Sequence, residues 1–272
     1  MSNLPDGFKM RRLAVAGLLI FFVAVAAFPV TGLGQQGGAI TVSAAISLKD
    51  ALDEIAPMYE KRVPGAKIAL NFGGSGTLQH QIEQGAPADV FFSAAEKQMN
   101  AMEEEGLLLN GTRRDIVLNT LVLIAPNDSK VVENFGDLAR PEVKAVALGE
   151  PNTVPAGLYA QQTLEHLRLL EAVRKKIVYA KDVRAVLTFV ETGNADAGFV
   201  YGTDARTSSM VRVVETATAD SHDEIVYPAA VLKATKSPEL AKAFLDFLAG
   251  DGARGVFVKY GFAAAENPAG KN

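Results

Sequence analysis

From residue 40 onward, short apolar runs rich in β-branched residues alternate with segments whose apolar residues recur every three or four positions. The first run, 40–45, is typical of a strand, and in the next segment Leu48, Leu52 and Ile55 share one face of a helix. Such alternation predicts an α/β fold with mostly parallel sheets flanked by helices. The expected strands are 40–45, 67–72, 89–93, 116–125, 143–148, 177–180, 197–201, 211–215 and 225–232, and the expected helices are 48–63, 77–84, 96–105, 156–170, 182–192, 203–208, 238–248 and 252–259.

The first 34 residues have the order of a secretory signal peptide. Lys9, Arg11 and Arg12 precede an uncharged apolar run over 13–30, as a basic segment precedes the hydrophobic segment of such signals. Small residues at 24–26 and a glycine-rich stretch up to 38 place the expected cleavage between residues 26 and 38. The alternative is an uncleaved N-terminal membrane anchor, although the run is short for a span and contains Pro29. Export of this kind predicts a periplasmic protein.

Composition excludes several classes of function. The 272 residues contain no cysteine, so disulfide scaffolds, iron–sulfur clusters, cysteine nucleophiles and lipid anchors on cysteine are not available within this chain. Three histidines leave little for a histidine metal site, so we expect no bare metal ion. The formal net charge is −4, and it becomes −6 without residues 1–34, which hold three basic residues and one acidic residue. That balance argues against a nucleic acid as partner.

Candidate binding groups lie where strands end and helices begin, because ligands of α/β sheets bind at those edges. In the first such turn, 44–48, Ser47 is placed to be the N-cap of the next helix or to present its hydroxyl and amide to an anion. In the second turn, 72–78, Gly74 and Gly76 flank Ser75 and let the backbone approach a ligand closely. The alternative for this second turn is a flexible connection, and it lacks the lysine of a phosphate-binding P-loop.

Three later turns offer backbone amides and one phenol. Pro155 is placed to begin a helix and to leave the amide of Ala156 accessible. Asp182 is the expected N-cap of a helix that begins at Val183, and Tyr201 ends an apolar strand. Each of these features also has an ordinary structural explanation: a proline-started helix, a plain cap and a core tyrosine.

Other reactive groups are less informative. His80 lies in a polar helix near Glu83, where we expect a solvated surface side chain. The sequence contains no serine–histidine–aspartate set with a nucleophile elbow, so it gives no support to a hydrolase.

Six short motifs occur in a fixed order along the chain. They read AAISL at 44–48, GGSGTL at 73–78, GAPADV at 85–90, VPAGLYA at 154–160, DVR at 182–184 and VYGTDA at 200–205. Together they resemble the periplasmic molybdate-binding proteins, the substrate-binding components of ABC importers, over about residues 39–262. Two departures stand out, since Ile46 replaces a smaller residue and the second turn is glycine-rich where the family is serine-rich.

The resemblance implies a two-lobed type II periplasmic solute-binding fold that closes around a tetrahedral oxyanion. It carries the ligand groups of the family onto the five turns already described, with four neighbouring residues that support them. The implied molybdate-binding residues are Ser47, Ser75, Ala156, Val183 and Tyr201, and the supporting residues are Gly74, Gly76, Pro155 and Asp182.

The chemistry of these residues agrees with such a ligand. Molybdate is a dianion without a proton at neutral pH, so its site needs hydrogen-bond donors and no acceptor. Hydroxyls, amides and a phenol supply donors without any charged side chain. Tungstate has almost the same size and would bind as well, and sulfate is the nearest rival oxyanion. An enzyme on the same fold and a regulatory sensor domain are the alternatives from other classes.

The order of the turns also predicts the domains. The first two ligand turns precede residue 119 and the last three lie within 156–201, so we expect lobe one over 39–119 plus 226–272 and lobe two over 120–225. The anion would bridge the lobes and select the closed state, which the membrane permease of an ABC importer would recognise. We expect a monomer that needs no cofactor.

Overall fold

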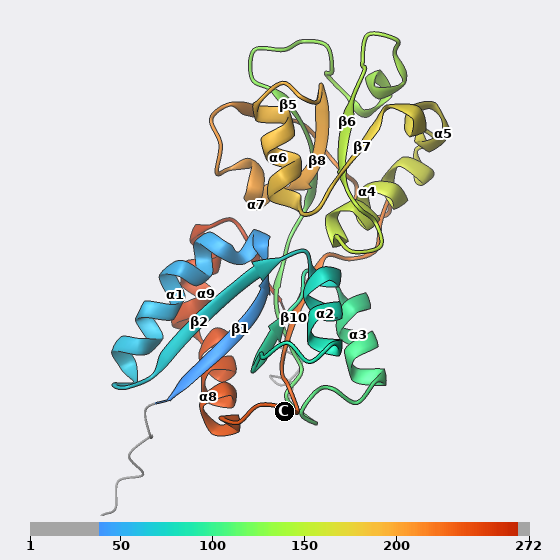
Figure 1. Ribbon diagram of the computed structural model, residues 1–272. Helices are drawn as coiled ribbons and strands as arrows, with labels where there is room; N and C mark the ends of the chain where they lie inside the picture. The colour runs from blue at the N-terminus through green and yellow to red at the C-terminus, as the bar shows by residue number, and fades with distance from the viewer. Residues whose placement is uncertain (1–37, 266–272) are drawn as a thin grey trace, which may run out of the picture. The chain divides into compact units, whose positions relative to one another are not determined.

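The computed structural model describes residues 38–265, which form two β-sheets with helices packed against them (Figure 1). The predicted signal peptide lies outside the described residues. The strands are β1 (Ala39–Ala45), β2 (Lys67–Gly73), β3 (Val90–Phe92), β4 (Arg114–Leu118), β5 (Leu121–Pro126), β6 (Val146–Gly149), β7 (Ile177–Ala180), β8 (Ala197–Tyr201), β9 (Val211–Thr216), β10 (Val226–Val231) and β11 (Ala263–Ala264). The α-helices are α1 (Lys49–Arg62), α2 (Ser75–Glu83), α3 (Glu96–Glu104), α4 (Pro155–His166), α5 (Leu170–Val173), α6 (Val183–Glu191), α7 (Gly202–Ala205), α8 (Pro238–Leu248) and α9 (Asp251–Lys259). Short 3-10 helices cover Ile46–Leu48, Phe135–Ala139 and Arg174–Lys176.

Both sheets are mixed. The first has the strand order β11-β4-β10-β3-β1-β2, and the second has the order β7-β6-β8-β5-β9. In the first sheet β1 pairs in parallel with β2 and β3, whereas β10 runs antiparallel to β3 and β4. In the second, β6 is parallel to β7 and β8, and β5 is antiparallel to β8 and β9. The α/β class is therefore confirmed, and most strands of each sheet run in one direction, while β10 and β5 each insert against the direction of their neighbours.

The predicted strand 116–125 is two strands that belong to different sheets. β4 ends at Leu118 and β5 begins at Leu121, and the backbone changes hydrogen-bond partners at the two residues between them. The amide of Asn119 donates to the carbonyl of Ile225 at 3.1 Å, and the carbonyl of Thr120 accepts from Gly202 at 2.9 Å. The strands of the first sheet come from 39–118 and 226–264, and those of the second come from 121–216.

Three helices differ from their predicted bounds by two residues or more at one end, and one of them, α7, ends at Ala205 and not at residue 208. Helix α2 begins at Ser75, two residues earlier than expected, because Gly74 takes the extended N-cap conformation. The predicted helix 156–170 ends at His166, and Arg168 then adopts a left-handed conformation with φ of 60°. A left-handed residue ends a helix, and glycine usually occupies such a position, so an arginine there is no signal of this stop.

Close packing of helices on the second sheet holds its strand ends in place. A Cβ atom at Gly198 of β8 would lie 2.9 Å from side-chain carbons of Val186 and Val190 in α6, so the helix rests directly on this strand. Phe135 stacks on Phe199 from the other side, with ring centroids 5.8 Å apart. Such dense apolar packing tolerates few alternative positions for the turns that follow β6, β7 and β8. Among residues 38–265, none of the helices has the length and apolar character needed to cross a membrane.

Candidate functional site

The five predicted ligand turns meet at one small pocket. It holds about 190 Å³ of space that protein atoms do not fill, part of which is open to solvent. Strand ends of both sheets contribute to it, and all five predicted ligand residues are among those that form its wall. The lining residues are Ala45, Ile46, Ser47, Gly73, Gly74, Ser75, Ala94, Val154, Pro155, Ala156, Val183 and Tyr201.

Ser47 does not have its predicted capping role. It lies inside the 3-10 turn Ile46–Leu48, whose N-cap position is occupied by Ala45. The Ser47 hydroxyl instead lies 3.0 Å from the phenol oxygen of Tyr227 on β10. Asn119 Nδ2 donates to that same phenol oxygen at 3.2 Å. The hydroxyl of this buried serine is therefore held between Tyr227 and the pocket.

Ser75 presents its hydroxyl at the start of α2. The side chain is fully buried, and its Oγ accepts a hydrogen bond of 2.9 Å from the amide of Ala94. Because this bond uses the oxygen as acceptor, the hydroxyl proton is left for an acceptor in the pocket. The first amides of a helix also lack intrahelical partners and lie at the positive end of its dipole.

Ala156 and Val183 bring two more helix N-termini to the pocket. Pro155 is the first residue of α4 and Ala156 is the second, so the alanine amide belongs to the unpaired first turn. Val183 is the first residue of α6, and the carboxylate of Asp182 accepts from the amide of Ala185 at 2.8 Å. The N-cap prediction for Asp182 is confirmed, and since this carboxylate serves its own helix, it leaves the amide of Val183 for a ligand.

Tyr201 carries the clearest sign of a missing hydrogen-bond partner. It is 1% exposed at the end of β8, and within residues 38–265 its phenol oxygen has no partner at ordinary hydrogen-bond geometry, the phenol of Tyr227 lying close to it without forming a well-aligned bond. Burial raises the pKa of this phenol well above its ordinary value, and the neighbouring phenols of Tyr227 and Tyr159 act in the same direction. The group is therefore a neutral O–H donor at neutral pH. A buried donor without a partner is costly, so its position on the pocket wall points to a ligand that accepts its proton.

Gly74 and Gly76 allow the turn after β2 to contact the turn after β6. The amide of Gly76 donates to the carbonyl of Thr153 at 2.9 Å. A Cβ at Gly76 would lie 2.6 Å from the Cα of Thr153, and a Cβ at Gly74 would lie 3.0 Å from its carbonyl oxygen. The amide of Gly76 is thus engaged by Thr153, so the expected role of this glycine-rich turn as an anion-binding nest does not extend to it.

The cation next to the pocket wall is neutralised by carboxylates. Arg184 Nη2 and Asp50 Oδ2 are 2.5 Å apart, and Arg184 Nε and Asp204 Oδ1 are also 2.5 Å apart. Asp204 is fully buried, and burial raises its pKa to about 6 even though the guanidinium opposes that shift. The lining of the pocket itself includes no carboxylate, lysine or arginine. Its chemistry is that of neutral donors.

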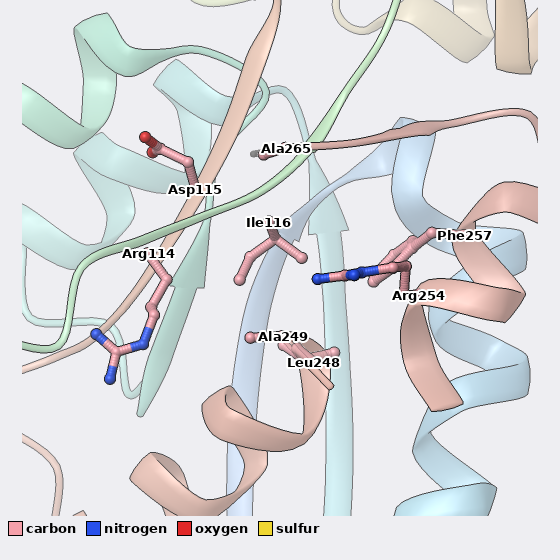
Figure 2. A pocket seen from close by; sticks show the side chains of 8 residues that line it. All are labelled: Arg114, Asp115, Ile116, Leu248, Ala249, Arg254, Phe257 and Ala265. Atoms are coloured by element: carbon pink, nitrogen blue, oxygen red, sulfur yellow. The ribbon is translucent and has the colours of Figure 1, made fainter. Parts of the chain in front are cut away.

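A second pocket lies beside β4, α8 and α9 and shares no lining residue with the first (Figure 2). Ile116, Leu248 and Phe257 give it apolar walls, and the side chain of Arg254 extends toward Ile116 (Figure 2). The carboxylate of Asp115 points away from this space (Figure 2). Residues 38–265 contain no group of three or more histidine, aspartate or glutamate side chains placed to hold a metal ion.

Sequence reasoning missed the residues that lie behind the ligand groups. Tyr227 and Ala94 contact the two serines from other elements, and Asn119 contacts the phenol of Tyr227. Nothing in their local sequence distinguishes these three from ordinary core or loop residues. The prediction for His80 was correct, because its side chain is 60% exposed and pairs with Glu83 at 2.9 Å.

Comparison with known proteins identifies the family. The family model for bacterial extracellular solute-binding proteins matches residues 40–263, which is most of the chain. The chain belongs to this family.

Individual relatives of this solute-binding protein match over most of their length. YvgL of Bacillus subtilis (strain 168), whose provisional name is that of an ABC transporter substrate-binding lipoprotein, is 48% identical over 83% of this chain and 86% of its own. The molybdate-binding protein ModA of Haemophilus influenzae is 40% identical over 86% of this chain and 95% of its own. The solved structure of the periplasmic molybdate-binding protein of Azotobacter vinelandii superposes with a TM-score of 0.75 at 27% identity, over 84% of this chain and all of that one. The two-lobed solute-binding fold predicted for this chain is thereby confirmed.

Proposed function

We propose that this solute-binding protein captures molybdate, and also tungstate, in the pocket formed by the five turns and delivers it to the permease of an ABC importer. The observation that carries the proposal is the buried phenol of Tyr201, which lacks a protein partner among residues 38–265 and faces a pocket lined by neutral groups. Proteins 40% and 38% identical to this chain are named molybdate-binding proteins, which supports the choice of ligand.

The donor set suits an oxyanion that carries no proton. Ser47 and Ser75 would donate hydroxyl protons, Ala156 and Val183 would donate amide protons, and Tyr201 would donate its phenol proton. The N-termini of α2, α4 and α6 add positive potential at the same place. The first pocket offers no carboxylate that could accept a proton from its ligand. The ligand that matches this set is a small anion that accepts hydrogen bonds on every side.

Neutral donors can supply enough free energy for tight binding. A hydrogen bond to a charged group contributes about 1.5–3 kcal/mol, and a micromolar dissociation constant corresponds to about −8 kcal/mol. Five residues that donate together can therefore reach micromolar affinity after the costs of association. The formal net charge of −4 would repel a dianion at a distance, so the aimed dipoles must act at close range.

Other tetrahedral anions match this pocket less well. Phosphate keeps a proton near neutral pH, and a selective phosphate site would need an acceptor for it. The nearest candidate, Asp182, is engaged by the amide of Ala185. Sulfate also lacks a proton, but it is smaller than molybdate. The Gly76–Thr153 contact holds the turns after β2 and β6 at a fixed spacing, so the hydrogen bonds from these turns to sulfate would be longer.

The chain would act as a carrier in the periplasm, as a monomer without a cofactor and without catalysis. Lobe one (39–119 plus 226–272) and lobe two (120–225) would close on the anion, because Ser47 and Ser75 lie on the first sheet side and the other three ligand residues lie on the second. The permease would bind the closed form, which the ligand populates.

Thermal unfolding in the presence of different oxyanions tests the proposal. A ligand that binds only the native state raises its stability by about 2.7 kcal/mol at a hundredfold excess over Kd. Molybdate and tungstate should raise the Tm of the full-length protein, whereas phosphate should leave it unchanged and sulfate should raise it less. An unchanged Tm with both molybdate and tungstate would refute the proposal, and an equal rise with sulfate would make the site a general oxyanion site.

A further inference from the structure

Behind the pocket, three side chains form a hydrogen-bonded chain that ends at Ser47. Tyr227 of β10 is fully buried, and its ring packs edge-on against Tyr201 and Phe262 with centroids 5.6 and 5.5 Å away. Its phenol oxygen lies 3.0 Å from Ser47 Oγ and 3.2 Å from Asn119 Nδ2. The phenol oxygen therefore has two hydrogen-bond partners, Ser47 and Asn119, and the phenol of Tyr201 lies beside it.

The amide of Asn119 has a fixed orientation. Its Oδ1 accepts from the amide of Thr120 at 2.9 Å, so its Nδ2 is the group that faces Thr203 Oγ1 at 2.9 Å and Tyr227. An amide nitrogen can only donate. The phenol oxygen of Tyr227 consequently accepts from Asn119, and its proton is available to Ser47 Oγ, although either oxygen of that pair can be the donor.

We propose that Tyr227 and Asn119 are positioning residues that fix the hydroxyl of Ser47 as a donor to the bound oxyanion and thereby reject anions that carry a proton. Once Ser47 Oγ accepts from Tyr227, its own proton takes the direction of the pocket that Ser47 lines. Ser75 is held in the same sense, because its oxygen accepts from the amide of Ala94. Both serine hydroxyls then present hydrogen, and a protonated anion such as hydrogen phosphate meets donors where it needs an acceptor.

The inference rests on the proposed function, since it assumes an unprotonated oxyanion as ligand. Tyr227→Phe removes the phenol oxygen and keeps the ring that packs on Tyr201 and Phe262. Without that donor, the Ser47 hydroxyl is free to rotate and its oxygen is free to accept from a protonated ligand. Calorimetric titration of the full-length protein at pH 7.5 should show molybdate and sulfate affinities that each fall by about tenfold, while phosphate affinity changes by less than about twofold.

Two further variants show whether the effect passes through Ser47. In a Ser47→Ala background, Tyr227→Phe should change molybdate affinity by less than about twofold, because the group on which it acts is gone. Asn119→Asp replaces the donor by an acceptor and turns the phenol proton away from Ser47, so it should narrow the ratio of molybdate to phosphate affinity as Tyr227→Phe does. Tyr59→Phe is the matched control, since it removes another buried phenol oxygen, one without a hydrogen-bond partner among residues 38–265. That control should leave both affinities unchanged.

The outcomes separate this inference from the proposed function. If the unmodified protein binds neither molybdate nor tungstate, the proposed function and the inference are both refuted. The inference alone would be overturned if the unmodified protein binds molybdate and Tyr227→Phe changes neither the molybdate affinity nor the selectivity against phosphate. The inference would also be overturned if Tyr227→Phe lowers molybdate affinity in the Ser47→Ala background as much as it does in the unmodified protein. Such a result would show that the phenol acts on the fold and not through Ser47.

Discussion

Replacing Gly76 with alanine should weaken ligand binding without destabilising the protein. The added Cβ would lie 2.6 Å from the Cα of Thr153, 3.0 Å from its carbonyl oxygen and 3.1 Å from the carbonyl oxygen of Asn152. All three atoms belong to the backbone, so no side chain can rotate away to make room. The contact between the turns after β2 and β6 would therefore have to separate, and those turns carry Ser75 and Ala156.

The size of the effect follows from the overlap. Ordinary contacts of a Cβ atom begin near 3.4 Å, so the turns must move apart by close to an ångström, and the hydrogen bond from Gly76 to Thr153 is strained or lost. Overpacking of this kind costs about 1–3 kcal/mol. If that cost falls on the ligand-bound form, Kd rises by about 5- to 150-fold. Alanine is also a better helix former than glycine by about 1 kcal/mol, so α2 itself gains stability in the ligand-free protein.

Calorimetric titration with molybdate and thermal unfolding without ligand measure the two effects separately. Gly255→Ala is the matched control, because it adds a methyl group to the exposed face of α9, where a Cβ would have no neighbour within 4 Å among the described residues. We expect unchanged affinity for the control, and weaker binding with equal or higher Tm for Gly76→Ala. Unchanged molybdate affinity in Gly76→Ala would show that the Gly76–Thr153 contact is not part of the bound state.

Two other predictions concern the pocket and its surroundings. Ser75→Ala should weaken molybdate binding by about tenfold or more through loss of one hydrogen bond to a charged ligand, and it should also lower the Tm, because the buried amide of Ala94 loses its acceptor. His80→Ala should leave calorimetric affinity unchanged because that side chain is exposed. Equal affinities for the two variants would remove Ser75 from the site. Because burial raises the pKa of Asp204 to about 6, the folded state holds that proton over a range where the unfolded state has released it, so the stability contributed by Asp204 is fully present below about pH 4 and declines toward pH 6. Urea denaturation at several pH values measures the free energy of unfolding of the unmodified protein and of Asp204→Asn. The difference between the two, unmodified minus variant, should fall between pH 4 and 6 and then level off. A rise in this difference over that interval would contradict the raised pKa of Asp204.

The positions of the ligand turns could be predicted because each follows a local rule. Glycines around Ser75, a proline before Ala156 and an aspartate before Val183 are signals of helix starts, and helix starts in α/β sheets gather at one edge. The structure brings Ser75, Ala156 and Val183 to one pocket. The alternation of apolar runs similarly identified the strands that build the two sheets.

Features that depend on contacts distant in the sequence could not be predicted. The antiparallel insertion of β10 between β3 and β4 requires a return from the second sheet that no local pattern specifies. Ser47 resembles an N-cap in sequence, yet its hydroxyl bonds to Tyr227, which lies 180 positions further along the chain. The break between β4 and β5 is invisible to periodicity, because apolar residues continue on both sides of Asn119.

A crystal structure of the full-length protein with molybdate, with diffraction recorded at the molybdenum absorption edge, tests the central claim most directly. The account predicts one anomalous peak within the pocket, with its oxygen atoms about 2.7–3.2 Å from donors of Ser47, Ser75, Ala156, Val183 and Tyr201, and with no charged side chain in contact. A peak beside lysine or arginine side chains, or none in this pocket, would contradict it.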